Sequence, residues 1–432
     1  MRSPRAHRWI ALVVMGMALA VPAFGGAAAE STTPRAAPVV GAEFLISDIG
    51  AATDESAAAV AASGNGYLVV WEDLRDQGTT GTDIYGQMVS ATGTLVGDDF
   101  RISDSPTSSN EVAPAVAWNG SEYLVVWSDG RKVSQRGTDI YGRRVSAAGV
   151  PVDDGFRITG AGALGFESSP AVAWSGAEYL VAWEDSRNDP ARKTDIFGRR
   201  VSAAGAPQGT DFRISGTNAL DQEFRPAVAW GDTEYLVVWE DSRNSGARGI
   251  DVRGRRVSAA GEPEGKDIRI SGTSAVADDK VPQAAWNGTE YLVVWEDWRM
   301  DPDRQSDIYG RRVSAAGAPI GANFRICGPG AVGWDWTPAV AWDDSMGQYL
   351  VVWQDERDYG TRGADIYGRR LAADGARVGG DFSISGAGPT SEYGPAVAWG
   401  GDEHLVVWQD ARSVPASGRD IYGRRVELPA PA

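Results

Sequence analysis

The chain has 432 residues, of which 41 are Lys or Arg and 58 are Asp or Glu, so its formal net charge is -17 at pH 7. A surface this acidic repels nucleic acid and anionic membranes, so neither is an expected partner. Beyond the N-terminus no segment reaches about 18 continuous apolar residues, which predicts that the chain does not insert into a membrane. Cys327 is the single cysteine, so no internal disulfide can form.

The N-terminal segment has the pattern of a secretion signal. Arg2, Arg5 and Arg8 precede an apolar stretch over residues 9–20, and Ala27–Ala29 supply the small residues of a signal-peptidase site. The apolar stretch is too short to cross a bilayer as a helix. We therefore predict a cleaved signal peptide at residues 1–29, a short linker at 30–39, and a secreted or periplasmic protein. An uncleaved anchor is the alternative.

The rest of the chain repeats seven times. Each unit contains, in order, Pro-Ala-Val-Ala-Trp, then Tyr-Leu-Val-Val-Trp-x-Asp-x-Arg, then Asp-Ile-Tyr-Gly-Arg-Arg-Val, then Phe-Arg-Ile-Ser, with small variations. The spacing between successive copies is close to 56 residues. The tryptophans of the second string mark the repeats: Trp71, Trp127, Trp183, Trp239, Trp295, Trp353 and Trp408.

Each unit predicts four short strands. Its segments are rich in Val, Ile, Tyr, Phe and Trp, and turn sequences such as Asn119-Gly120 separate them. The Tyr-Leu-Val-Val-Trp string is apolar at consecutive positions, which is typical of a strand with both faces buried. The sequence therefore predicts an all-β fold, a single seven-bladed β-propeller of four-stranded blades over residues 40–432.

The order of the strings predicts how the ring closes. The first unit is preceded by a variant of the fourth string, Phe44-Leu45-Ile46-Ser47, whereas the last unit ends at Val426 without one. We therefore expect Phe44–Ser47 to pair with the strand Tyr422–Val426 and to complete the last blade. Closure of this kind removes the open sheet edges that would otherwise aggregate. A linear solenoid, the alternative, would need capping repeats instead.

These strings, over residues 40–426, resemble the repeat of TolB-type β-propellers. The resemblance implies a propeller fold and an extracytoplasmic location. The chain departs from the family pattern between the first two strands, where Trp-x-Gly-x-Glu-Tyr stands in place of Ser-Pro-Asp-Gly. The resemblance therefore implies none of the partners of TolB itself.

One face of the predicted ring carries a repeated set of charges. The loop between the second and third strands and the connector between blades lie on this face, and every blade supplies three acids and one arginine there. The first interpretation is structural, with the arginine paired to acids of its own or the next blade. The second is calcium binding, with Glu223, Asp241 and Asp251 as the ligands of one blade. We expect no cofactor, and calcium remains the alternative.

Four aromatic residues on the same face depart from the repeat. Trp298, Trp334 and Trp336 lie outside the repeated tryptophan positions, and Tyr359 lies in a variable loop tip. Aromatic side chains on such a rim are typical of sugar-binding and protein-binding sites. We take these four residues as candidate binding residues. The alternative is that they fill local gaps.

Catalysis has little support in the sequence, and no catalytic residue is predicted. After the predicted signal peptide His404 is the single histidine, and it stands where the other six repeats have tyrosine. Zinc, nucleophile-elbow and dinucleotide motifs are absent, although the many acids leave glycoside chemistry open. We expect a secreted, non-catalytic, monomeric propeller that binds a protein or a carbohydrate through its loop-rich face. The alternatives are a polysaccharide hydrolase or lyase acting in the central channel, and a structural cell-surface repeat protein.

Overall fold

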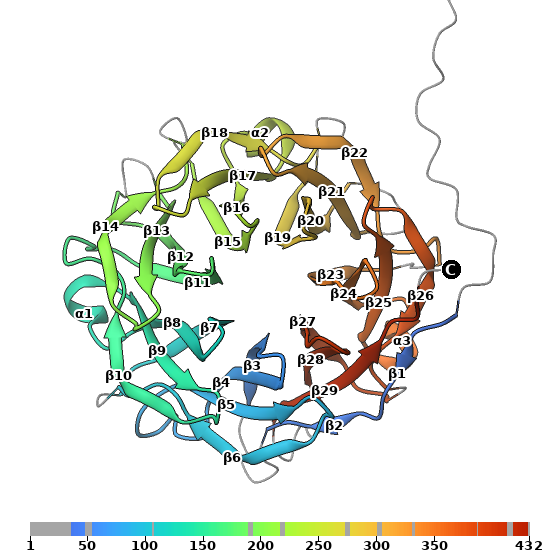
Figure 1. Cartoon of the computed structure of the whole chain (residues 1–432), viewed down its shortest axis with the longest axis horizontal. Helices are drawn as coiled ribbons and strands as arrows, with labels where there is room; N and C mark the ends of the chain where they lie inside the picture. Colours follow the sequence, from blue (N-terminus) through green and yellow to red (C-terminus); the bar gives the residue numbers. More distant parts are fainter. Residues whose placement is uncertain are drawn as a thin grey trace, which may run out of the picture.

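The computed structural model describes residues 36–47, 54–105, 108–188, 193–216, 221–272, 277–299, 305–330, 333–386, 388–412 and 418–430. The predicted signal peptide and the start of the predicted linker lie outside these residues. Seven antiparallel sheets stand around a central axis, each with its first strand innermost (Figure 1). The chain is thus a seven-bladed β-propeller, as the repeat predicts.

The strands of each blade follow one another from the axis outward. The innermost strands are β3 (Glu55–Ala62), β7 (Glu111–Trp118), β11 (Glu167–Trp174), β15 (Glu223–Trp230), β19 (Asp279–Trp286), β23 (Asp335–Asp343) and β27 (Glu392–Trp399). The second strands are β4 (Gly66–Asp73), β8 (Glu122–Asp129), β12 (Glu178–Asp185), β16 (Glu234–Asp241), β20 (Glu290–Asp297), β24 (Gln348–Asp355) and β28 (His404–Asp410).

The outer half of each blade is equally regular. The third strands are β5 (Asp83–Ser90), β9 (Asp139–Ser146), β13 (Asp195–Ser202), β17 (Asp251–Ser258), β21 (Asp307–Ser314), β25 (Asp365–Ala372) and β29 (Asp420–Glu427). The fourth strands of the first six blades are β6 (Leu95–Arg101), β10 (Pro151–Arg157), β14 (Pro207–Arg213), β18 (Pro263–Arg269), β22 (Pro319–Arg325) and β26 (Arg377–Ser383).

The N-terminal segment completes the last blade. Two short strands, β1 (Val39–Val40) and β2 (Phe44–Leu45), pair antiparallel with β29. Val39 lies opposite Glu427 and Phe44 lies opposite Gly423. The predicted closure through Phe44–Ser47 is therefore confirmed, and strand pairing begins at Val39.

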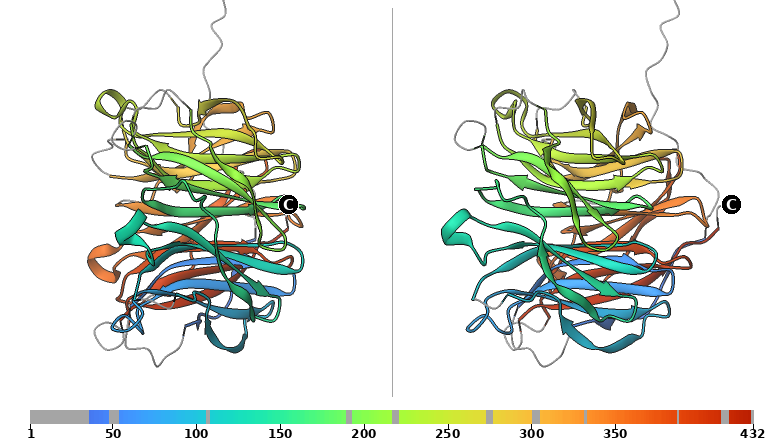
Figure 2. Two further views of the ribbon diagram at one scale, coloured as in Figure 1. Left: turned by 90° about the vertical axis from the view of Figure 1, so that its left-hand side faces the viewer. Right: turned by 60° about the vertical axis from the view of Figure 1, so that its left-hand side comes forward.

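Short helices follow the second strand in three blades: α1 (Val133–Arg136), α2 (Ser245–Arg248) and α3 (Tyr359–Arg362). Figure 2 shows the ring edge-on with these three helices on one face, which we call the loop face. Strand direction places the bulged start of every innermost strand on the loop face and its end on the opposite face. Among the described residues, no helix is long and apolar enough to cross a bilayer.

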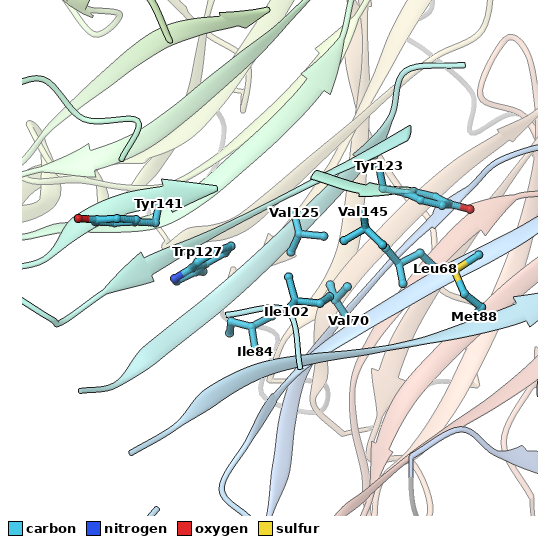
Figure 3. Close-up of a cluster of buried hydrophobic side chains, with 10 residues drawn as sticks. All are labelled: Leu68, Val70, Ile84, Met88, Ile102, Tyr123, Val125, Trp127, Tyr141 and Val145. Carbon is cyan, nitrogen blue, oxygen red and sulfur yellow. The ribbon is translucent and has the colours of Figure 1, made fainter. Parts of the chain in front are cut away.

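The hydrophobic core lies between neighbouring blades. All seven repeated tryptophans of the second strands are fully buried, because each blade is covered on both sides. At the contact of the first two blades, Trp127 and Tyr123 pack with Leu68, Val70 and Met88 of the preceding blade (Figure 3). Repetition of this contact around the ring explains why the second strand is apolar at consecutive positions.

A repeated arginine ties four of the blades to the blade before them. The guanidinium of Arg255 on β17 donates to the main-chain carbonyl of Ile214, 2.9 Å away in the preceding blade. Arg199 and Arg311 make the equivalent contact with the corresponding isoleucine carbonyl of the blade before their own. In the first blade the equivalent residue is Gln87, whose amide instead donates to carbonyls of its own blade. A cavity of about 250 Å³ lies here, between Gln87 and the closing segment at Ile46.

We expect Gln87→Arg to strengthen this junction. The longer side chain can reach the Ile46 carbonyl as its counterparts reach theirs, and a charged hydrogen bond of this kind contributes about 1 kcal/mol or more. Urea unfolding should therefore show a higher midpoint for Gln87→Arg and a lower one for the converse variant Arg255→Gln. Equal midpoints for wild type and Gln87→Arg would mean that the closing junction does not limit stability.

Candidate functional site

The repeated arginines of the loop face are held by acids of their own blade. The guanidinium of Arg243 lies 2.5 Å from Asp241, 2.5 Å from Asp267 and 3.5 Å from Glu223. Asp251 in turn lies 2.6 Å from the guanidinium of Arg269. Each of the three candidate calcium ligands therefore faces a cation of the protein itself, an arrangement that favours the structural interpretation.

The described lining of the central channel is almost entirely apolar. The channel has a volume of about 380 Å³, and the described residues that line it are almost all Pro, Ala and Val from the innermost strands, with Gln283 and Thr337 as polar exceptions. None of these lining residues is an acid, a histidine, a lysine or an arginine. A general acid or base for hydrolysis of a polysaccharide is thus missing from the described channel wall.

The geometry of the loop face depends on a bulge in every innermost strand. The third residue has a positive φ, close to 50°, and the register with the second strand shifts at this point. The residues are Ala57, Ala113, Ser169, Arg225, Val281, Thr337 and Gly394. A bulge turns the main-chain N–H out of the sheet ladder, so that it needs another acceptor.

Glutamates of the preceding blade supply that acceptor. The carboxylates of Glu184, Glu240 and Glu296 accept the bulge N–H of the next blade at 2.8, 2.8 and 2.6 Å, and Glu72 does so at 2.7 Å. Each glutamate occupies the variable position of Trp-x-Asp at the end of a second strand. The other three blades have Ser128, Gln354 and Gln409 at this position.

Three of these glutamates lie in one groove on the loop face. The groove has a volume of about 730 Å³ and crosses the third to sixth blades, between the channel mouth and the blade connectors. Its charged and aromatic lining residues are Glu184, Glu240, Glu296, Arg225, Lys280, Phe224, Trp298 and Trp336. It therefore combines aromatic surface with polar groups, as small-ligand sites do.

The predicted tryptophans form one wall of this region. The ring centroids of Trp298, Trp334 and Trp336 lie 4.9 to 5.3 Å apart, and Trp334 and Trp336 are stacked with an interplanar angle of 20°. The ammonium of Lys280 lies 4.4 Å from the Trp298 ring centre, a cation–π contact. All three rings are half-buried, because they pack on one another.

Two of the four candidate binding residues line the groove. These are Trp298 and Trp336, whereas Trp334 packs behind them and does not line it. Tyr359 lies on α3 with 58% of its surface exposed, and it is not a groove residue either. The structure therefore brings the three tryptophans together and leaves Tyr359 apart.

Two carboxylates of the groove are buried beneath an exposed arginine. Glu240 and Glu296 expose only 1% and 2% of their surface, while the side chain of Arg225, which pairs with Glu240 at 2.9 Å, is 57% exposed. Burial raises the pKa of Glu296, although hydrogen bonds from the Thr337 N–H and the Trp298 indole partly lower it. Burial opposes the charge of Arg225, but the carboxylates of Glu240, Glu184 and Glu296 raise its pKa overall. A ligand in the groove thus meets hydrogen-bond donors first.

Sequence analysis missed the charged half of the groove. Arg225 stands where other bulges have Ala, Ser, Val, Thr or Gly, and Lys280 stands one position before a bulge. The glutamates occupy a position that varies from blade to blade. Arg225 and Lys280 could have been found by the signal that revealed the tryptophans, namely departure from the repeat on the loop face.

No protein-family model and no curated protein matches the chain. Solved structures do match its fold. The polysaccharide lyase Uly1 matches with a TM-score of 0.53, 9% identity and coverage of 86% of this chain and 90% of that chain. A protein of unknown function from Dyadobacter fermentans DSM 18053 matches with a TM-score of 0.52 and 11% identity, and the match covers 90% of this chain and 98% of that chain. The endosialidase of phage phi92 matches with a TM-score of 0.51 and 7% identity, covering 90% of this chain and 70% of that chain. At these identities the likeness is one of fold.

Proposed function

We propose that this chain is a non-catalytic binding protein that takes a carbohydrate in the groove of the loop face. The observation that carries the proposal is the wall of Trp298 and Trp336 beside the exposed guanidinium of Arg225. Flat aromatic surface suits the apolar faces of a sugar ring, and neighbouring hydrogen-bond donors suit its oxygens. A protein ligand on the same face is the second candidate, favoured by the exposed side chains of Tyr359, Leu164 and Phe166.

Two of the three groove carboxylates are inaccessible, which argues against a catalytic pair. A hydrolase needs two carboxyl groups that reach the scissile bond. Glu240 and Glu296 are almost completely buried, and each is already engaged by a bulge N–H, so they hold the wall together and do not reach a substrate. The fold is shared with a polysaccharide lyase and an endosialidase, and an enzyme acting on polysaccharide is therefore the alternative to be assayed.

The test is a glycan array probed with wild type and with the double variant Trp298→Ala/Trp336→Ala. We expect the double variant to lose bound glycans by tenfold or more in affinity, since aromatic anchors dominate such sites and contribute roughly 1–2 kcal/mol each. Tyr359→Ala is the matched control, because this aromatic residue lies outside the groove, and its binding should equal that of wild type.

Three outcomes would contradict the proposal. The first is a wild-type protein that binds no glycan, and the second is glycan binding that survives in the double variant. The third is release of shortened products from a bound polysaccharide, which would favour the enzyme. Circular dichroism of each variant shows whether a loss of binding comes from the site or from unfolding.

We also propose that the chain is exported and that its repeats are related to those of TolB-type propellers. The proposal of export is supported by the arginines and the apolar stretch of residues 1–29. Expression of the full chain in a bacterial host, followed by sequencing of the mature N-terminus, tests it. A mature protein that begins at Glu30 is the expected result, and a chain that retains Met1 in the cytoplasm would contradict it.

A further inference from the structure

The face opposite the loop face carries a ring of aromatic pairs. Six innermost strands place a tryptophan here, and each tryptophan packs on the tyrosine or histidine opposite it on the second strand, with ring centroids 4.5 to 4.8 Å apart. These tryptophans are Trp118, Trp174, Trp230, Trp286, Trp342 and Trp399. In the first blade Ala62 takes this position, opposite Tyr67.

The alanine leaves a depression in the ring. Its volume is about 570 Å³, and Trp118 of the second blade and Trp399 of the last blade line it together with Ala62. The remaining lining residues are small or polar: Ser63, Gly64, Asp344, Ser345, Gly400 and Gly401. We call this depression the Ala62 gap.

Both aromatic walls of the gap are held in place. The indole N–H of Trp399 donates to the carboxylate of Asp344 at 2.7 Å, and the ring packs on His404 at 4.8 Å. Burial lowers the pKa of His404 to about 3, so this ring is uncharged in the physiological range. Trp118 packs on Tyr123 at 4.5 Å. The walls are therefore preorganised, which reduces the entropy that a ligand must overcome.

We propose that the Ala62 gap binds a neutral sugar residue. The two indoles offer apolar faces to a sugar ring, and the serine hydroxyls, the Asp344 carboxylate and the main chain of the glycines offer partners for its hydroxyl groups. Asp344 is the one charged side chain of the lining, and the chain has a net charge of -17, so an acidic sugar is disfavoured.

A purely apolar ligand fits this lining less well. The Ser63 and Ser345 hydroxyls and the Asp344 carboxylate each have one hydrogen bond within the protein. An apolar peptide side chain would displace water from their remaining hydrogen-bonding positions without replacing those bonds, which costs free energy. The gap is also separate from the groove of the loop face, since it lies at the other end of the innermost strands. Binding here is therefore independent of the proposed function of the groove.

The test uses the residue that the other six blades supply. Ala62→Trp fills the gap with an indole in the position that the repeat already accommodates, so the variant should fold. Saturation-transfer NMR is recorded with four probes, methyl β-glucoside, methyl β-galactoside, methyl α-mannoside and N-acetylglucosamine. We expect transfer to at least one probe in wild type, and a loss of roughly tenfold or more in its affinity in Ala62→Trp.

Two further variants keep the result interpretable. Trp298→Ala/Trp336→Ala removes the wall of the loop-face groove and should leave this transfer unchanged. Asp344→Ala changes an exposed residue and removes the anchor of Trp399, so it should weaken the same transfer even if Ala62→Trp fails to fold.

Either of two results would overturn the proposal. One is that no probe shows transfer that depends on Ala62 or Asp344. The other is that N-acetyltryptophanamide, an apolar probe, binds in an Ala62-dependent way while the four sugars do not. If transfer depends on Trp298 and Trp336 alone, the groove binds sugar and the gap does not.

Discussion

Deletion of residues 30–48 is expected to abolish the soluble, cooperatively folding ring. This segment supplies β1 and β2, which form the outer edge of the last blade. Ile46 is buried in the core between the last and first blades, and the Ser47 hydroxyl accepts the N–H of Ile421 at 3.0 Å. Without the segment, β29 becomes an exposed edge of eight residues, and such edges promote aggregation.

The closing segment also supplies a carboxylate that pairs with two arginines of the last blade. Glu43 lies 2.5 Å from Arg412 and 3.3 Å from Arg424, and its carboxylate accepts the N–H of Gly386 at 3.1 Å. The deletion therefore has two effects: it exposes the edge of β29, and it removes the carboxylate that pairs with these two guanidinium groups. The combined effect should exceed that of any single substitution in the ring.

Size-exclusion chromatography with light scattering and thermal unfolding measure this effect. The matched control is a permuted chain in which residues 39–48 follow Glu427 through the Ala-Ala-Gly turn that joins the third and fourth strands of other blades. Because Val39 already lies opposite Glu427, this chain should recover a monomeric ring. A deletion variant that stays monomeric with an unchanged melting temperature would show that closure contributes little.

The sequence predicted the fold because the same core contacts recur in every blade. Trp239 and its six counterparts had to be buried on both faces, and all of them are. The closing pair was predictable for a related reason, since Phe44–Ser47 carries a variant of the string found in the outer strands of the other blades. Register follows from such strings because a slip of one residue would expose the buried face.

The candidate site was predictable only in part. Trp298 and Trp336 were found because they break the repeat, but their partners Arg225, Glu240 and Glu296 were not. Their arrangement depends on the bulge of each innermost strand, which Gly marks in one blade and which Arg225 and Val281 adopt with a positive φ as well. No residue pattern common to the seven bulges marks them in the sequence, so the contacts between the bulge N–H groups and the carboxylates of the preceding blade are seen only in the structure.

Stability is expected to fall as the pH rises from about 5 to about 9. The first residue of each innermost strand is a buried carboxyl group, and it lies opposite the repeated aspartate of the second strand, as Glu223 lies opposite Asp241. Burial, with these neighbouring acids, raises the pKa of Glu55, Glu111 and Glu223 to about 8. It likewise raises the pKa of Glu167 and Glu392 to about 9.

The sign of the effect follows from proton linkage. These carboxyl groups have a higher pKa in the folded chain than the ordinary value of 4.5 that they regain on unfolding. Between the two values the folded state binds more protons, so unfolding releases protons and becomes more favourable as the pH rises. Each such proton lowers the free energy of unfolding by about 1 kcal/mol per pH unit, and several act together.

Opposite behaviour is expected in acid. Ion pairs with Arg253 and Arg243 outweigh the burial of Asp267 and lower its pKa, so its stabilising contribution is lost once that carboxylate is protonated. Stability should therefore be greatest near pH 4 to 5, above the lowered pKa of Asp267 and close to the ordinary value of 4.5 at which the decline begins. A melting temperature measured at intervals from pH 2 to pH 9 covers both limbs of the curve.

The variant Glu223→Gln tests the contribution of one of these carboxyl groups to the pH dependence of stability. Glutamine has the shape of the protonated acid and cannot lose its proton, so the variant should be more stable than wild type at pH 8 and should show a shallower decline above pH 5. Glu262→Gln is the matched control at an exposed position, and its curve should follow wild type. A stability maximum at pH 8 or above, or identical curves for Glu223→Gln and wild type, would mean that the innermost carboxyl groups are ionised in the folded ring.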